Sequence, residues 1–314
     1  MGAYIVRRIA QTLVILFLLS VIVFLIMHLL PGDPVRMILG GEASHEEVEM
    51  VRKELGLDRP LPVQYVSWLG GVLQGDLGTS FASKEKVIDL IKKRLPVSFH
   101  IGICAFVLAL MIGIPAGIIA AVKRGGWIDS LITVMANLGM AVPVFWLGIL
   151  GIYFFSLKLG WLPVQGYTSP FDDFWKSLKQ TAMPIVLLSL TTLAQVARQT
   201  RSAMLEVIRQ DYIRTARAKG LKEKDVILRH ALRNALIPVI TILGVGMGHL
   251  VGGSVFIEQV FNLPGMGRLM VQSIFNHDIV VVQAIVLVVA TVVAAANLLV
   301  DIAYGYLDPR IRYR

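Results

Sequence analysis

Six long stretches of this chain contain no Asp, Glu, Lys or Arg, and their lengths range from 18 to 28 residues. A helix that crosses roughly 30 Å of hydrocarbon needs about 20 residues, because each residue adds about 1.5 Å. The stretches are continuously apolar and do not alternate every second residue, which favours helices over the strands of a barrel. The sequence therefore predicts an all-α membrane protein with six transmembrane helices, at residues 9–32, 95–122, 130–157, 180–197, 234–257 and 279–300.

The composition supports this prediction. Hydrophobic residues make up 56% of the chain and charged residues only 16%, which is too apolar for a soluble domain of 314 residues. Arg7 and Arg8 precede the first stretch as in a secretion signal, but the stretch is too long and lacks a small-x-small cleavage site. We therefore expect an uncleaved first span. The single cysteine, Cys104, lies in the second stretch, so an internal disulfide is excluded.

The distribution of basic residues predicts the orientation of the spans. If the N-terminus is inside and six crossings alternate, the inside segments carry 17 of the 30 Lys and Arg residues. The inside segments then have a net charge of +10 and the outside segments −1. Short inside loops of membrane proteins are enriched in Lys and Arg. We therefore expect both termini in the cytoplasm.

Residues 31–94 are predicted to form a small helical insertion outside the membrane. Ser44 and Glu47 have the spacing of a capping box at a helix start, and Gly56 marks the end of that helix. The residues leave two roles open for the insertion, lying on the membrane over the spans or contacting an external partner. The predicted divisions of the chain are the first helix with its tail at 1–30, the insertion at 31–94, a five-helix core at 95–301 that includes a basic loop at 198–236, and a cytoplasmic tail at 302–314.

Proline and glycine residues interrupt several of the apolar stretches. Proline frees a backbone carbonyl and bends a helix, so we expect bends at Pro115 and Pro143. Three glycines at four-residue spacing in the fifth stretch predict either a close helix–helix contact or the lining of a substrate path. These glycines are Gly244, Gly248 and Gly252, and three further prolines, Pro96, Pro184 and Pro238, are expected near helix starts, where proline costs little.

Motifs for catalysis and metal binding are missing from the sequence. It has no G-x-x-x-x-G-K-[ST] phosphate loop, no H-E-x-x-H, no paired cysteines and no G-x-S-x-G. The six stretches also lack a carboxylate that would take up a coupling ion, and we expect the acids at their ends, Asp33, Glu258 and Asp301, at the interface. We therefore predict no catalytic residue, no metal site and an energy source outside this chain.

A dense basic segment lies between the fourth and fifth stretches. Seven Lys and Arg residues fall within residues 211–233. Apolar residues recur at helical spacing from Leu205 to Ala216, and Gly220 ends this pattern. A second helical stretch begins at Lys222. We therefore predict two short helices joined at a glycine. From the residues alone, this loop is either an interfacial hairpin on anionic lipid or a docking element for a cytoplasmic protein.

The segments "DYIRTARAKGL" and "HALRNALIPVIT" resemble the cytoplasmic coupling loop of binding-protein-dependent ABC importer permeases. The chain is similar to the first permease subunit of the dipeptide/oligopeptide/nickel family, since "LLPGDPV", "ELGLDRPL", "QGDLGTSF", "GIPAGIIAAVKRG", "FNLPGMGRL" and "LDPRIR" follow in the expected order. One departure is that Arg214, Thr215 and Ala216 replace the Glu-Ala-Ala of the general importer pattern. Contacts that require the glutamate are therefore not expected.

The resemblance implies a type I ABC importer permease without enzymatic activity of its own. Its implied partners are a second homologous permease, two ATPase subunits or domains, an extracytoplasmic solute-binding protein and membrane lipid, but no nucleic acid. ATP and Mg would be bound by the ATPase partners, and this chain would hold no cofactor. The implied location is the cytoplasmic membrane of a bacterium or an archaeon.

The resemblance also implies roles for particular residues. In the basic loop, the implied coupling residues are Asp211, Tyr212, Ala216, Arg217, Ala218, Lys219, Gly220 and Leu221. Gly220 would form the turn, and Arg217 and Lys219 would supply charge that governs register more than affinity. Between the last two spans, contacts to the binding protein are implied for Glu258, Phe261, Asn262, Pro264, Gly265 and Arg268; the alternative there is a re-entrant turn packed between spans.

The implied substrates are short peptides, with nickel chelates, glutathione or another small solute as alternatives. The rival classes are a self-sufficient secondary transporter or channel and an intramembrane enzyme. Uptake by this chain without ATPase partners would distinguish the rival transporters from an importer permease.

Overall fold

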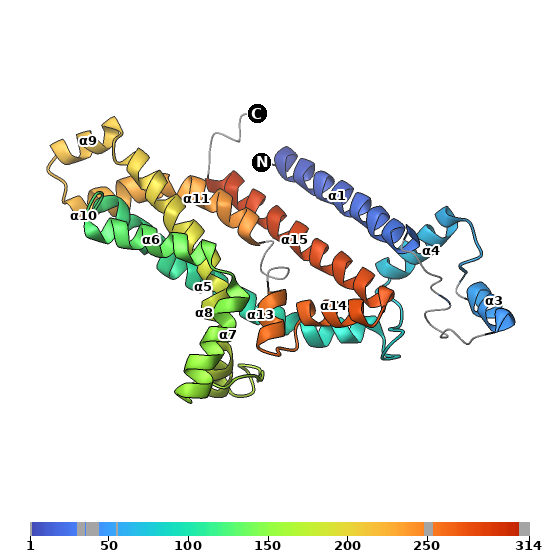
Figure 1. Ribbon diagram of the computed structural model, residues 1–314. Helices are drawn as coiled ribbons and strands as arrows, with labels where there is room; N and C mark the ends of the chain where they lie inside the picture. Colours follow the sequence, from blue (N-terminus) through green and yellow to red (C-terminus); the bar gives the residue numbers. More distant parts are fainter. Residues whose placement is uncertain (1, 30–34, 36–43, 55, 248–253, 308–314) are drawn as a thin grey trace.

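The computed structural model describes all residues except 1, 30–34, 36–43, 55, 248–253 and 308–314. This part of the chain is helical, apart from turns and one isolated bridge between Thr79 and Lys86. Figure 1 shows that the helices form an elongated, open assembly, with α9 at one end and α3 at the other.

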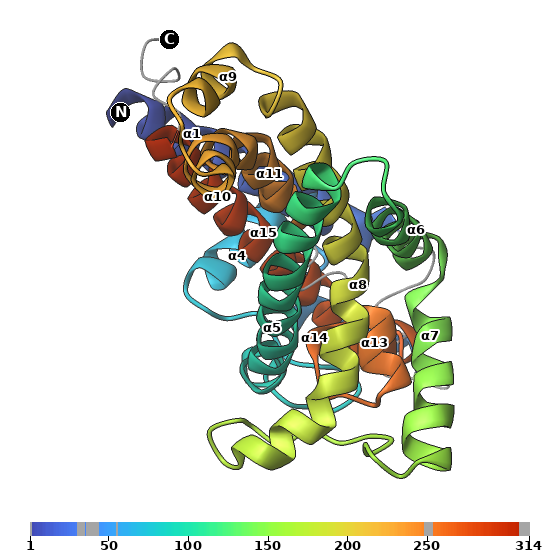
Figure 2. The ribbon, with the colours of Figure 1, turned by 90° about the vertical axis from the view of Figure 1, so that its left-hand side faces the viewer.

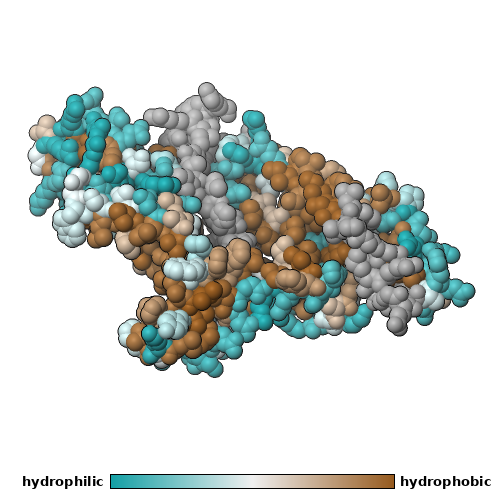
Figure 3. Space-filling model, viewed as in Figure 1, coloured by the Kyte–Doolittle hydropathy of each residue, from teal (hydrophilic) through white to brown (hydrophobic). Residues whose placement is uncertain are grey.

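Four helices are long and apolar enough to cross a membrane, and they coincide with the first, second, fourth and sixth charge-free stretches. They are α1 (Gly2–Leu29), α5 (Val87–Val122), α8 (Phe174–Val207) and α15 (Ile279–Leu307). On the face seen in Figure 3, hydrophobic residues gather over the middle of the molecule and hydrophilic residues cover the regions of α9 and α3. Such a surface fits a chain whose middle lies in hydrocarbon.

The third stretch is a broken helix and not one straight span. It comprises α6 (Trp127–Ala141), α7 (Val144–Gly151) and the π-helical segment η1 (Ile152–Lys158), with a bend of 98° between the two halves. Pro143 caps α7 at this bend, which confirms the bend expected there. If the bent pair counts as one span, the described residues contain five.

The fifth stretch is only partly described. It contains α11 (Leu232–Met247) and part of α13 (Val255–Val260). Gly244 belongs to α11, whereas Gly248 and Gly252 lie outside the described residues. The predicted count of six spanning helices therefore goes beyond what the described residues contain.

The predictions for three other prolines were wrong. Pro96, Pro184 and Pro238 lie inside α5, α8 and α11 and not at their starts. In α5 and α8 the helices begin well before the charge-free stretches, at Val87 and Phe174, because polar turns extend each helix beyond its apolar part. Asp173 caps α8, where its side chain accepts a hydrogen bond from the Lys176 amide at 3.0 Å.

Helices α5 and α8 form the central pair of the fold, and their backbones touch (Figure 2). A Cβ atom on Gly113 would lie 2.9 Å from the Leu193 carbonyl oxygen, and one on Gly117 would lie 2.5 Å from that of Ala197. Only glycine permits this approach. Pro115 lies between the two glycines on the exposed side of α5, which remains helical through this position.

The first helix packs along the last one. Arg8 and Asp301 form an ion pair at 3.3 Å, and the Tyr4 hydroxyl donates to the Asp301 carbonyl oxygen at 3.2 Å. The N-terminal end of α1 and the C-terminal end of α15 therefore lie together, on the same side of the molecule as α9 (Figure 2).

The insertion contains the predicted helix, α3 (His45–Glu54), and a second helix, α4 (Leu61–Leu73). The capping box is confirmed, since the Ser44 amide donates to Glu47 Oε2 at 2.9 Å and the Glu47 amide donates to Ser44 Oγ at 3.3 Å. These hydrogen bonds lower the pKa of Glu47. Helix α4 lies against α1, where the hydroxyls of Tyr65 and Ser20 are 2.8 Å apart. Helix α4 therefore packs on the first span.

Candidate coupling site

The basic loop is a helical hairpin built on the ends of α8 and α11. Helix α9 (Asp211–Ala218) is followed by Gly220, then by α10 (Glu223–Asp225) and the π-helical segment η2 (Val226–Ala231), which continues into α11. Gly220 has a φ of +76°, and nothing lies within 4 Å of a Cβ atom placed on it. The turn therefore favours glycine because of its backbone conformation and not for lack of space.

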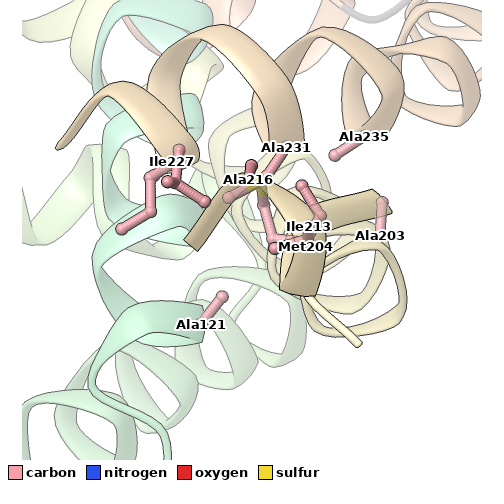
Figure 4. Close-up of a cluster of buried hydrophobic side chains, with 9 residues drawn as sticks. Ala121, Ala203, Met204, Ile213, Ala216, Ile227, Ala231 and Ala235 are labelled. Carbon is pink, nitrogen blue, oxygen red and sulfur yellow. The ribbon is translucent and has the colours of Figure 1, made fainter. Parts of the chain in front are cut away.

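One face of α9 is buried against the protein itself. Ile213 is 0% exposed and Ala216 is 7% exposed. Figure 4 shows that both point into an apolar cluster, which we call the coupling cluster. The cluster joins side chains from α5, α8, α9, η2 and α11, namely Ala121, Ala203, Met204, Ile213, Ala216, Val226, Ile227, Ala231 and Ala235. The base of α9 is thus fixed to the ends of the central helix pair.

The predicted helix from Leu205 to Ala216 was wrong in its extent. Helix α8 ends at Val207 and α9 begins at Asp211, so Leu205 and Ile208 do not share a face with α9. Ala216 was predicted to contact a partner, but its side chain points inward and packs in the coupling cluster. A methyl group at this position permits close packing, which explains why a small residue belongs there.

The outward side of α9 carries the other implied coupling residues. The side chain of Asp211 is 96% exposed, and Tyr212 is 43% exposed. Ala218, Lys219 and Leu221 are also exposed. They form a mixed polar and apolar ridge, which we call the α9 ridge and define as Asp211, Tyr212, Ala218, Lys219 and Leu221.

Two side-chain contacts hold the hairpin in shape. Arg217 binds Glu223 across the Gly220 turn through both carboxylate oxygens, at 2.7 and 3.1 Å. The pair raises the pKa of Arg217 and lowers that of Glu223, mainly through these hydrogen bonds. Asn234 of α11 donates to the Tyr212 hydroxyl at 2.8 Å. The ion pair of Arg217 with Glu223 therefore stabilises the turn. Of the two cations that were predicted to supply charge, Arg217 and Lys219, only Lys219 is left for the α9 ridge.

A second pair of charges lies beside the coupling cluster. Asp129 of α6 and Arg201 of α8 bind each other through two hydrogen bonds of 2.6 and 2.8 Å. This pair was not predicted from the sequence, because its members are 72 residues apart and no local pattern links them. The close contact of α5 with α8 at Gly113 and Gly117 was also not predicted. The four-residue spacing of these glycines is typical of such a contact and could have indicated it.

The connection before the last helix is an inward-packed elbow, formed by α13 and α14 (Met266–Phe275). Glu258 is 0% exposed, so its side chain is not available for the predicted contact with the binding protein. Its carboxylate accepts hydrogen bonds from the Ser98 and Ser254 hydroxyls, at 2.6 and 2.7 Å, and from the Arg268 amide at 3.0 Å. These three donors satisfy the buried carboxylate and fasten the elbow to α5.

Other predicted contact residues of the elbow divide between its inside and its surface. Phe261 and Gly265 are buried, and a Cβ atom on Gly265 would collide with the Glu258 carboxylate. Asn262 is exposed and donates to Gln165 Oε1 at 2.8 Å, while Arg268 donates to the Asn262 carbonyl oxygen at 3.1 Å. Pro264 is half-buried beside them. The alternative of a packed turn therefore describes most of this segment.

The fold defines a polytopic α-helical membrane protein with a structured hairpin on one side. Two family comparisons identify its class. Residues 113–313 match the family described as "Binding-protein-dependent transport system inner membrane component". Residues 1–102 match the N-terminal family described as "Binding-prot-dependent transport system membrane comp, N-term". The chain belongs to the binding-protein-dependent ABC importer permeases of the peptide/nickel family.

Relatives of similar length support this membership. A Brucella abortus protein named "Putative peptide transport system permease protein" is 45% identical over 313 residues, covering 100% of both chains. The glutathione transport system permease protein GsiC of Pectobacterium atrosepticum is 44% identical over 311 residues, covering 99% of both chains.

A solved structure supports the fold alone. An inward-facing structure of the MetNI methionine ABC transporter matches with a TM-score of 0.59 at 19% identity, covering 70% of this chain and 96% of that chain. Family and fold together make this chain a multi-pass, non-catalytic permease subunit of the inner membrane. It works in an importer that also comprises ATPase and solute-binding components.

Proposed function

We propose that this permease subunit forms one half of the translocation path of an importer of short peptides, beside a second homologous permease. Two full-length relatives support the substrate class. One is named for peptide transport, and the other for glutathione, which is itself a tripeptide. Both are more than 40% identical to this chain from end to end.

The α9 ridge is proposed to dock in a groove on an ATPase subunit. The observation that carries this proposal is the coupling cluster, which joins the base of α9 to the ends of α5 and α8. Close-packed protein interiors are not continuously deformable. A displacement of α9 would therefore move the central pair as a rigid body. The ridge offers Tyr212 and Leu221 for apolar contact, and Asp211 and Lys219 for charge complementarity.

The side of the molecule that bears α9 is proposed to be cytoplasmic. It carries the basic hairpin, the start of α1 with Arg7 and Arg8, and the turn after α5 with Lys123 and Arg124. Such an excess of basic residues is typical of cytoplasmic loops. ATP and Mg would then bind in the ATPase subunits on that side, and hydrolysis would drive the motion of the hairpin.

On the opposite side, the exposed part of the elbow is proposed to face the solute-binding protein. Asn262, Pro264 and Arg268 remain at the surface, and hydrogen bonds to Gln165 and within the segment hold them in place. Glu258 would keep this surface fixed to α5 without touching the binding protein.

Reconstitution of the complete transporter tests the proposal. The chain would be purified with its second permease and its ATPases, inserted in liposomes, and supplied with its binding protein. Uptake of radiolabelled trialanine and glutathione would be measured with and without ATP inside the liposomes. We expect ATP-dependent uptake of at least one peptide and none by this chain alone. Uptake by this chain without its ATPases would contradict the proposal.

A further inference from the structure

The ion pair between Asp129 and Arg201 is built more tightly than a surface contact. Arg201 Nε lies 2.6 Å from Asp129 Oδ1, Arg201 Nη2 lies 2.8 Å from Oδ2, and the Gly125 amide donates to Oδ2 at 3.0 Å. The Asp129 side chain is only 7% exposed. Two parallel hydrogen bonds fix the relative orientation of both side chains, which a single contact does not do.

The pair lies at the base of the hairpin. Arg201 precedes Ala203 and Met204 of the coupling cluster by two and three residues on α8. Gly125 and Asp129 follow Ala121 of the same cluster by four and eight residues. The pair thus connects α6 to α8 beside the place where α9 is anchored.

Helix α6 packs along α8 with few buried side chains. Asp129 and Ala136 are its two buried residues, while large apolar side chains such as Val134 and Leu138 are exposed. Toward its other end, Gly139 approaches α8, and its Cβ position is 3.5 Å from the Leu190 carbonyl oxygen. Asp129 is the buried residue at the hairpin end of α6, so the ion pair fixes this end of the helix against α8.

Beyond α6, the chain leads to the elbow. After the bend at Pro143, Gly148 of α7 lies against the elbow, where a Cβ atom would be 3.1 Å from Val260 and 3.5 Å from Phe261. Helix α6 therefore runs from the hairpin side of the molecule toward α7 and the elbow (Figure 1).

We propose that Asp129 and Arg201 are positioning residues that make α6 move with α8, so that displacement of the hairpin reaches α7 and the elbow. This inference rests on the proposed function, because it assumes that ATPases displace α9. A buried ion pair is weak evidence for stability, since desolvation offsets its attraction, but its geometry can specify one arrangement of two helices.

Distance measurements on the assembled transporter test the inference. Spin labels would be placed on α6 and α8 by Val134→Cys and Glu206→Cys in a Cys104→Ser background. The distance between them would be measured by pulsed electron resonance, without nucleotide and with ATP and vanadate. We expect one narrow distance in both conditions for the native pair. With Asp129→Asn, the distribution broadens or shifts on adding ATP and vanadate.

Uptake and ATP hydrolysis supply the second readout. Asp129→Asn is expected to lower trialanine or glutathione uptake per ATP hydrolysed about tenfold, within the range of typical coupling effects, and to leave hydrolysis within about twofold. The exchanged pair, Asp129→Arg with Arg201→Asp, should restore a narrow distance and part of the uptake. Glu85→Gln is the matched control, because it removes an exposed ion pair with Lys93 of 3.1 Å at the far end of α5.

The outcomes are distinct. Unchanged distances and uptake in Asp129→Asn would overturn the inference, and so would a parallel loss of inserted protein, hydrolysis and uptake that the exchanged pair does not repair. If the native transporter and the Glu85→Gln control show no ATP-dependent uptake, the proposed function fails instead. The distance measurement then still decides whether α6 follows α8.

Discussion

At the scale of single residues, buried polar contacts hold the elbow, which was difficult to predict from the sequence. Glu258 borders an apolar stretch and was expected at the interface, yet it is fully buried. Its partner Ser98 lies 160 residues away on α5, and nothing in the local sequence links the two. Gly220, in contrast, was predictable as a turn, because a helix-breaking residue between two helical segments has a local signature.

Replacement of Glu258 should loosen the elbow. Glu258→Ala leaves the Ser98 and Ser254 hydroxyls and the Arg268 amide without their carboxylate acceptor, and a buried donor deprived of its acceptor costs about 1–3 kcal/mol. Glu258→Gln keeps one oxygen and should cost less. The measurement is the melting temperature of the detergent-purified subunit. Equal melting temperatures for the native protein and Glu258→Ala would contradict this account of the elbow.

Two replacements of Gly220 should have different effects, because one strains the backbone of the turn and the other prevents the turn from forming. Gly220→Ala places a side chain at a φ of +76° in open space and should cost about 1 kcal/mol, with a modest loss of uptake. Gly220→Pro should abolish uptake while membrane insertion persists, because proline requires a φ near −65°. Gly75→Ala is a control, since Gly75 has a φ of +85° and open space far from the hairpin. Normal uptake with Gly220→Pro would refute the role of the turn.

At the scale of elements, the lengths of the charge-free stretches predicted four spans well, because the length of an apolar stretch can be read directly from the sequence. The broken third span was harder to predict. Pro143 signalled a bend but not its angle of 98°, and beyond the bend Gly148 packs on the elbow residues Val260 and Phe261, which lie more than 100 residues further along the chain. The face of α9 was misassigned for a related reason. The apolar period runs across the junction of α8 and α9, and only the structure shows that a new helix begins at Asp211.

The two faces of α9 should respond differently to the same substitution. Ala216→Asp puts a carboxylate into the apolar coupling cluster, where an unpaired charge is costly, and should detach α9. Ala218→Asp changes the exposed ridge and should leave the hairpin folded but weaken ATPase binding. Hydrogen exchange of residues 211–218 and co-purification of the ATPases measure the two effects. Native exchange rates in Ala216→Asp would show that this face is not the buried one.

At the scale of the whole molecule, two ends of one helix pair carry different tasks. The α5–α8 pair bears the coupling cluster near one end and, through Ser98, holds the elbow near the other. The ion pair of Asp129 and Arg201 adds α6 to this unit. Under the proposed function, this arrangement would transmit motion of the hairpin along the central pair to the elbow.

Contact between the α9 ridge and an ATPase subunit can be tested directly. A photo-crosslinking amino acid at Leu221, which is exposed on the ridge, would be activated in the intact transporter, with Leu73 on α4 as an exposed control far from the hairpin. We expect a covalent adduct with an ATPase subunit from position 221 and none from position 73. Adducts only with lipid from position 221, in a transporter that is active in uptake, would contradict it.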